Sequence, residues 1–148
     1  MIATNSQAMD ELFRSHEKDE AREAEVDQAT ATRIRHALDA WENFRRTTLQ
    51  REVDAFMHQV TQSGGRANQV GGSKNSVCVE LFSLFDRGIA SGAALTFEVH
   101  PTERTISAEI SVGGRQGRCE NVLASDAAQE WVLRWFGFLM TDFRKNAR

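Results

Sequence analysis

Glycine and proline are almost missing from the first part of the chain. No glycine occurs before Gly64, nine of the ten glycines fall between Gly64 and Gly117, and Pro101 is the single proline. Both residue types interrupt helices and mark turns. We therefore expect a long helical part at the front, a middle part of strands joined by turns, and a second helical part at the end.

Cysteines and long apolar runs are also scarce. The two cysteines, Cys78 and Cys119, are too few for a disulfide framework, and the first residues lack the basic and then apolar pattern of a signal peptide. The longest apolar stretch, residues 131–140, includes Arg134 and is half the roughly 20 residues that span a bilayer. These features predict a cytoplasmic protein without a membrane segment.

No motif of a known catalytic or cofactor site is present. The chain contains neither HExxH nor CxxC, and neither GxxxxGK[ST] nor GxGxxG. His36 and His58 are 22 residues apart, about 33 Å along a straight helix, so they cannot share a metal within one subunit. A pairing of His100 with Cys78 or Cys119 lacks any further sign of a nucleophilic site. We therefore predict no catalytic residue, no metal and no cofactor.

Charge is unevenly distributed although the net charge is only -3. Residues 1–30 carry eight acidic and three basic residues, whereas residues 31–74 carry seven basic and four acidic ones. We interpret residues 1–30 as an acidic N-terminal extension that is either flexible or a solvated helix, and residues 31–148 as a single domain.

Apolar residues recur at helical spacing from about residue 26 to residue 60. An unbroken helix over this span would be roughly 50 Å long, wider than a small domain. We expect it either to be interrupted, at residues 29–32 or at Thr47 and Thr48, or to protrude. A protruding apolar stripe would be covered most simply by a second copy of the chain, which predicts a homodimer.

Strict alternation of apolar and polar residues predicts a hairpin around Pro101. If residues 101–104 form the turn, His100 faces Thr105 and Phe97 faces Ala108, and both strands place their apolar residues on one face. On the polar face, Glu98 and Glu109 would be diagonal neighbours, an arrangement open to acid–base chemistry but also typical of a solvated sheet.

The remaining elements complete the expected fold. Residues 77–85 predict a strand that is apolar on both faces, residues 118–123 a weaker last strand, and residues 61–76 a loop. Ser125 or Asp126 should cap a final helix, with Asp126 and Gln129 as a capping box. We predict an α+β fold with a long N-terminal helix, a three- to four-stranded antiparallel β-meander and a C-terminal helix packed on one face of the sheet.

Function is predicted only by class. The leading hypothesis is a non-catalytic, dimeric protein-interaction module, with the large apolar residues Trp41, Phe44, Phe82 and Leu84 as candidate contacts. An alternative is a small-molecule-binding or enzymatic domain with a pocket between the sheet and the last helix. Its candidate lining residues are Glu98, His100, Arg118, Trp131 and Trp135.

A third class, nucleic-acid binding, would depend on the basic part of the long helix. Its candidate residues are Arg33, Arg35, Arg45, Arg46 and Arg51. Acidic neighbours such as Asp39 and Glu42 dilute this patch, and no DNA- or RNA-binding motif occurs. We therefore expect no nucleic-acid partner.

Overall fold

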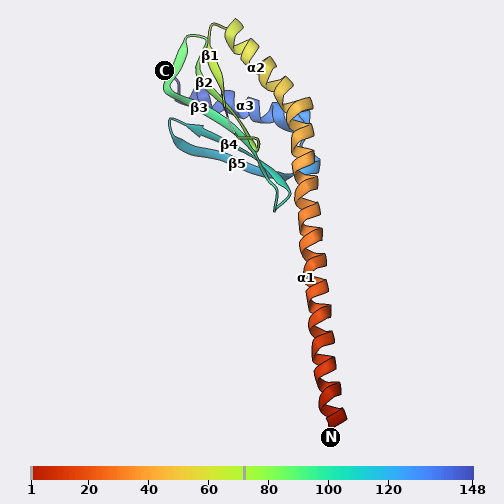
Figure 1. The fold of residues 1–148 in the computed structure, drawn as a ribbon. Coiled ribbons are helices and arrows are strands. Elements are labelled where there is room, and N and C mark those ends of the chain that lie inside the picture. The colour runs from red at the N-terminus through yellow and green to blue at the C-terminus, as the bar shows by residue number, and fades with distance from the viewer. Residues whose placement is uncertain (1, 72) are drawn as a thin grey trace.

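The computed structural model describes residues 2–71 and 73–148, with side chains described from residue 6 onward. A helix, α1 (Ile2–Phe44), leads into a short π-helical segment (Arg45–Leu49) and a second helix, α2 (Gln50–Gln62). A five-stranded sheet follows, and α3 (Gln129–Asn146) ends the fold. In Figure 1, α3 lies across one face of the sheet, while α1 extends far beyond it. The structure confirms the predicted α+β architecture.

The predicted interruption of the long helix falls at the second of the two expected places. Helical structure continues through residues 29–32, whereas Thr47 and Thr48 lie within the π-helical segment. The Thr47 hydroxyl donates a hydrogen bond of 2.7 Å to the Asn43 carbonyl, one turn earlier. A π-helical turn is a common place for a helix to change direction, and Figure 1 shows α2 bending away from α1 here.

The sheet contains five antiparallel strands in sequential order, β1 to β5. They are β1 (Arg66–Val70), β2 (Ser76–Leu84), β3 (Arg87–His100), β4 (Thr105–Val112) and β5 (Arg115–Leu123). The predicted count of three to four strands was therefore too low. The additional strand, β1, lies within residues 61–76, which were predicted to be a loop. Gly72 of that predicted loop is outside the described residues. It has no apolar alternation and is exposed at every position except Ala67, so it lacks the pattern that identifies a strand.

The hairpin around Pro101 forms in the predicted register. His100 lies opposite Thr105, Phe97 opposite Ala108, and Glu98 opposite Ser107. The inward residues of both strands are buried, which explains why this register is strongly specified: a slip of one residue would expose the whole apolar set.

A bulge explains why residues 77–85, which mostly form β2, have apolar residues on both faces of the strand pattern. The pairing of β2 with β3 shifts between Leu81 and Ser83, so Leu84 turns back into the core while Phe82 stays on the outer face. Gly92 makes room for Phe82, because a Cβ at Gly92 would lie only 3.0 Å from the Phe82 ring. Because Leu84 is buried in the core, it does not need a partner to cover it on the outer face of the sheet.

The last helix begins later than predicted and without the predicted cap. Asp126 belongs to a 3-10 turn (Ala124–Asp126), and Ala128, which has no capping side chain, precedes Gln129 at the start of α3. The capping-box prediction was wrong, because the chain needs an extended connection from β5 before it can cross the sheet. No membrane-spanning candidate occurs among the described helices, since none is both long and apolar enough.

The core lies between the inner face of the sheet and the helices. Phe97 of β3 contacts Trp131 of α3 edge to face with ring centroids 5.6 Å apart, and Phe56 of α2 stacks on Phe136 of α3 at 4.6 Å. Each large side chain buried here contributes roughly 1.5–3 kcal/mol. Aromatic packing thus joins α2, α3 and the sheet into one body.

Candidate interaction site

The residues predicted to line a pocket between the sheet and α3 do not come together. Trp131 and Trp135 are buried inside the core, where aromatic rings fill the space against β3. Glu98 and His100 belong to the opposite, outer face of the sheet, as the inward-facing Phe97 and Val99 between them show. Arg118 pairs with Asp142 of α3 at 2.9 Å and stacks over Phe138. No common ligand can touch all five residues.

Three of the four predicted contact residues are already covered within one chain. Trp41, Phe44 and Leu84 are each no more than 5% exposed and belong to the core. Phe82 alone remains partly exposed, beneath the Arg66 guanidinium, which lies 4.7 Å from its ring centre. Three of the four apolar side chains predicted to contact a partner therefore pack within their own chain instead.

The outer face of the sheet is polar and holds both cysteines. Cys78, Thr96, Glu109 and Cys119 form one row across four neighbouring strands. Three strand spacings of about 4.8 Å separate the cysteines by roughly 14 Å, too far for a disulfide. Burial raises the pKa of the Cys78 thiol, and Glu80 raises it further, against a hydrogen bond with Thr96.

On this outer face His100 contacts Ser107 and lies far from Cys78. His100 Nε2 lies 2.8 Å from the Ser107 hydroxyl. Cys78 pairs with Thr96, four residues from His100 along β3 and so roughly 13 Å away. Across the described residues, no group of three or more His, Cys, Asp or Glu side chains is close enough to hold a metal ion.

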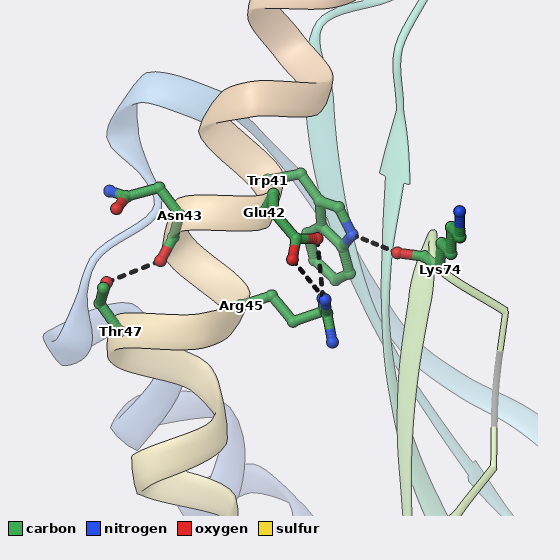
Figure 2. A network of polar contacts seen from close by, with 6 residues as sticks. All are labelled: Trp41, Glu42, Asn43, Arg45, Thr47 and Lys74. Carbon is green, nitrogen blue, oxygen red and sulfur yellow. Dashed lines mark hydrogen bonds and ion pairs between the residues drawn. The ribbon is translucent and has the colours of Figure 1, made fainter.

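The basic residues of the long helix are partly committed to local contacts. Arg45 donates to Glu42 at 2.6 Å, and this hydrogen bond holds the pKa of the Glu42 carboxyl below its ordinary value. Arg51 donates to the Thr47 carbonyl. In Figure 2 the contact between Arg45 and Glu42 lies beside Trp41, whose indole N–H donates to the Lys74 carbonyl at 2.8 Å and ties α1 to the loop between β1 and β2.

The first part of α1 has no such ties to the body. We call residues 6–33 the arm: every one of them is exposed, and the segment extends about 42 Å at 1.5 Å per residue. Four large apolar side chains on the arm are 54–64% exposed, namely Met9, Leu12, Phe13 and Val26. Met9, Leu12 and Phe13 are neighbours on the helix surface and so form an exposed apolar patch, a feature that often marks an interaction site.

The arm also lacks strong stabilisation of its own. Of the ion pairs found among the described side chains, none falls in the arm. Only Asp10 and Arg14 have opposite charges at i,i+4 spacing, whereas four pairs at that spacing carry like charges: Arg14 and Lys18, Lys18 and Arg22, Asp19 and Glu23, and Glu23 and Asp27. Like-charged neighbours destabilise a helix by roughly 0.2–0.5 kcal/mol each. At i,i+3 spacing four pairs carry opposite charges instead: Glu11 and Arg14, Arg14 and Glu17, Asp19 and Arg22, and Arg22 and Glu25. Favourable and unfavourable pairs therefore roughly balance, and charge pairing gives the arm little net stability.

A hollow of about 270 Å³ opens where the arm meets the body. Four of its lining residues come from α1, which are Arg33, His36, Ala37 and Ala40; the other four are Arg104, Leu123, Ala124 and Ser125. We call it the base hollow. Its apolar lining residues are Ala37, Ala40, Leu123 and Ala124, and Arg33, Arg104 and His36 also line it, so it suits an apolar group flanked by acidic ones.

The backbone holds the far side of the base hollow in a fixed position. Arg104 adopts a left-handed conformation with φ 58°, at the turn between β3 and β4. Its carbonyl accepts a 2.9 Å hydrogen bond from the Ala124 amide, which follows β5. Because the lining residues come from three segments distant in sequence, no local pattern identified this site.

A second hollow, of about 330 Å³, lies between α2, the β2–β3 turn and α3. It is lined in part by Phe56, Val60, Leu84 and Met140, and by Phe85, which has φ 55° and is 66% exposed. This hollow is mainly apolar and has no basic or acidic lining residue.

Comparisons of the chain with protein families, curated proteins and solved structures identify no related protein. The chain matches no protein-family profile, no curated protein and no solved structure. What the protein does must therefore be inferred from its own residues.

Proposed function

We propose that the protein is a non-catalytic protein-interaction module that works as a homodimer through the arm. The observation that carries this proposal is the exposure of Met9, Leu12, Phe13 and Val26 on the arm, in which every described side chain is exposed. An isolated helix is marginally stable in water, and most helices in proteins are stabilised by packing of an apolar face. A second protein surface supplies that packing.

The other two function classes have less support. The predicted pocket residues are divided between the core and the two faces of the sheet, so an enzyme or small-molecule site would need a different set of residues. The basic helix has Arg45 and Arg51 engaged in local bonds, and the arm that precedes it is acidic, which repels a nucleic-acid backbone.

A reducing, cytoplasmic location fits this proposal. Both cysteines are free thiols in the structure, and the roughly 14 Å between them excludes a bond within one chain. Free thiols are kept reduced in the cytoplasm, whereas secreted proteins use them in disulfides.

Light scattering on the full chain tests the proposal. We expect the measured mass to rise from one chain to two as the protein concentration increases. Replacing Met9, Leu12 and Phe13 together with serine should keep the protein monomeric over the same range. The matched control is Leu133→Ser, which removes a comparably exposed apolar residue (49%) from α3 and should leave the dimer intact.

Two results would contradict the proposal. One is a mass of a single chain at every concentration up to the millimolar range. The other is a dimer that the serine variant forms as readily as the unmodified protein, because the arm would then not be the contact.

A further inference from the structure

Among the residues that the structure describes, none fills the base hollow and none covers the tip of the arm. We propose that each base hollow receives the arm tip, residues Met9, Leu12 and Phe13, of a second copy, so that the two α1 helices lie antiparallel. This inference rests on the proposed function and names the site, direction and register of the contact.

The spacing along α1 connects the two surfaces. A stripe of alternating three- and four-residue steps, typical of two helices that wind around each other, passes through both of them. Its members are Met9, Leu12, His16, Asp19, Glu23, Val26, Thr30, Arg33, Ala37 and Ala40. On a straight α-helix this stripe drifts around the axis by roughly 20° every seven residues, so the two α1 helices would have to wind around each other in the dimer to bring the arm tip and the α1 wall of the base hollow to the same side.

Antiparallel pairing along this stripe matches large residues with small ones. When Glu23 lies opposite the partner's Val26 near the two-fold axis, Met9 falls opposite the partner's Ala40 and Leu12 opposite the partner's Ala37. Ala37 and Ala40 are lining residues of the base hollow. Ala40 is partly exposed, so Met9 would contact it directly, whereas Ala37 is only 4% exposed, so Leu12 would cover the hollow beside it.

Charge selects the direction of the pairing. Asp10 and Glu11 adjoin Leu12 at the arm tip, whereas Arg33, His36 and Arg104 surround the base hollow. A parallel pair would instead place two arms with eight acidic and three basic residues each alongside one another over their whole length. The antiparallel register still places Asp10 opposite the partner's Asp39 and residues 16–33 of the two arms side by side. The charge preference for this direction therefore comes from the two ends, where Glu11 and Asp10 approach the basic residues of the base hollow.

The middle of the stripe is polar, with His16, Asp19 and Glu23 in place of apolar residues. The two ends therefore carry the contact, once at each base hollow. Such an arrangement is isologous, since the same tip and the same hollow are used twice across a two-fold axis, and it closes at two chains.

Disulfide cross-linking tests the register. In a chain with Cys78→Ser and Cys119→Ser, Met9→Cys and Ala40→Cys are introduced on separate chains that are then mixed and oxidised. We expect a covalent dimer from the mixture and none from either single variant alone. Within one chain, residues 9 and 40 are about 46 Å apart on the same helix, so they cannot bond to each other.

A second cysteine pair keeps the test independent of the packing at Ala40. His16 and Arg33 are both exposed and lie opposite each other in the same register, so His16→Cys mixed with Arg33→Cys should also cross-link. Covalent dimers from Met9→Cys alone would show a parallel pair and overturn the inference. So would the absence of cross-links from both mixtures.

The outcomes separate this inference from the proposed function. If light scattering shows a dimer but the mixtures do not cross-link, the base hollow takes another ligand and the arms meet elsewhere. If the chain is a monomer throughout, both proposals fail together.

Charge reversal at the rim gives a second test on the unlinked protein. Arg104→Glu should raise the dissociation constant of the dimer by roughly tenfold at low salt, because it sets a carboxylate against Asp10 and Glu11 of the partner. The control Arg104→Gln keeps a non-glycine residue at the same left-handed φ and should weaken the dimer less. Equal effects of the two substitutions would contradict an electrostatic role for the rim.

Discussion

The two halves of α1 belong to one helix but meet opposite environments. In the second half Ala37, Trp41 and Phe44 are buried against the body, and Trp41 is 1% exposed with its indole N–H bonded to Lys74. Along the arm, the apolar residues are more than half exposed. The comparison teaches that helix formation and burial are separate requirements, because only the second half obtains its stability from its own chain.

The largest expected effect is on the free energy of unfolding when one apolar side chain is truncated in each half of α1. Trp41→Ala should lower the free energy of unfolding by about 3–5 kcal/mol, since it leaves a cavity in the core and an unpaired carbonyl at Lys74. Val26→Ala should change it by less than about 0.5 kcal/mol at a concentration where the protein is monomeric. Urea unfolding followed by tryptophan fluorescence measures both. Similar losses of unfolding free energy for the two variants would contradict the claim that only the second half of α1 is stabilised by its own chain.

The rates at which cysteines react should also differ between the arm and the body, by about tenfold. A cysteine placed on the arm by Val26→Cys should react with a thiol reagent at pH 8 roughly tenfold faster than Cys78, in a chain with Cys119→Ser. The reason is that Cys78 is partly buried and its raised pKa reduces the thiolate fraction. The raised pKa also means that Cys78 costs no stability at neutral pH, and that stability falls as the pH rises above the ordinary thiol pKa. A Cys78 that reacts as fast as the arm cysteine would refute this account of its burial.

Helix propensity provides a smaller test, in which a substitution should change the free energy of unfolding in α3 but not in the arm. Gly137→Ala in α3 should raise the free energy of unfolding by about 0.4–1 kcal/mol, because an added Cβ meets no atom within 4 Å. Ala24→Gly in the arm should leave that value unchanged while it reduces the helical circular dichroism signal. If Ala24→Gly destabilised the body by as much as Gly137→Ala stabilises it, the arm and the body would unfold as one unit.

The smallest effect is expected at the exposed pair of Glu42 and Arg45. The lowered pKa of Glu42 implies that the pair contributes above the ordinary pKa of the carboxyl and that this contribution is lost as the pH falls through its lowered value. Solvent screens such exposed pairs strongly. We expect unfolding curves of Glu42→Gln and the unmodified protein at pH 7 to agree within error, and a clear loss would show that the bend is held by this pair.

The parts of the fold that could be predicted are those with a periodic pattern of their own. The hairpin around Pro101 formed in its expected register because both strands alternate and a slip would expose their apolar residues. The interruption near Thr47 was also foreseeable, since threonine hydroxyls compete for helix carbonyls. By contrast, β1 has no alternation, and pairing with β2 alone makes it a strand.

The candidate site was less accessible to sequence reasoning. Trp41, Phe44 and Leu84 were predicted as contacts because they are large, but only the packed structure shows that β2, β3 and α3 leave room for them. The base hollow combines residues from α1, the β3–β4 turn and the segment after β5. Such a combination exists only after folding. The one signal available beforehand was the acidic charge of residues 1–30 beside the basic charge of residues 31–74.

Hydrogen exchange of the backbone amides in residues 6–33, measured at low and high protein concentration, tests the central claim most directly. The account predicts rapid exchange in dilute protein and strong protection once the dimer forms, while the amides of the sheet stay equally protected at both concentrations. Arm amides that exchange at the same rate at both concentrations would contradict it, because the arm would then gain nothing from a second copy.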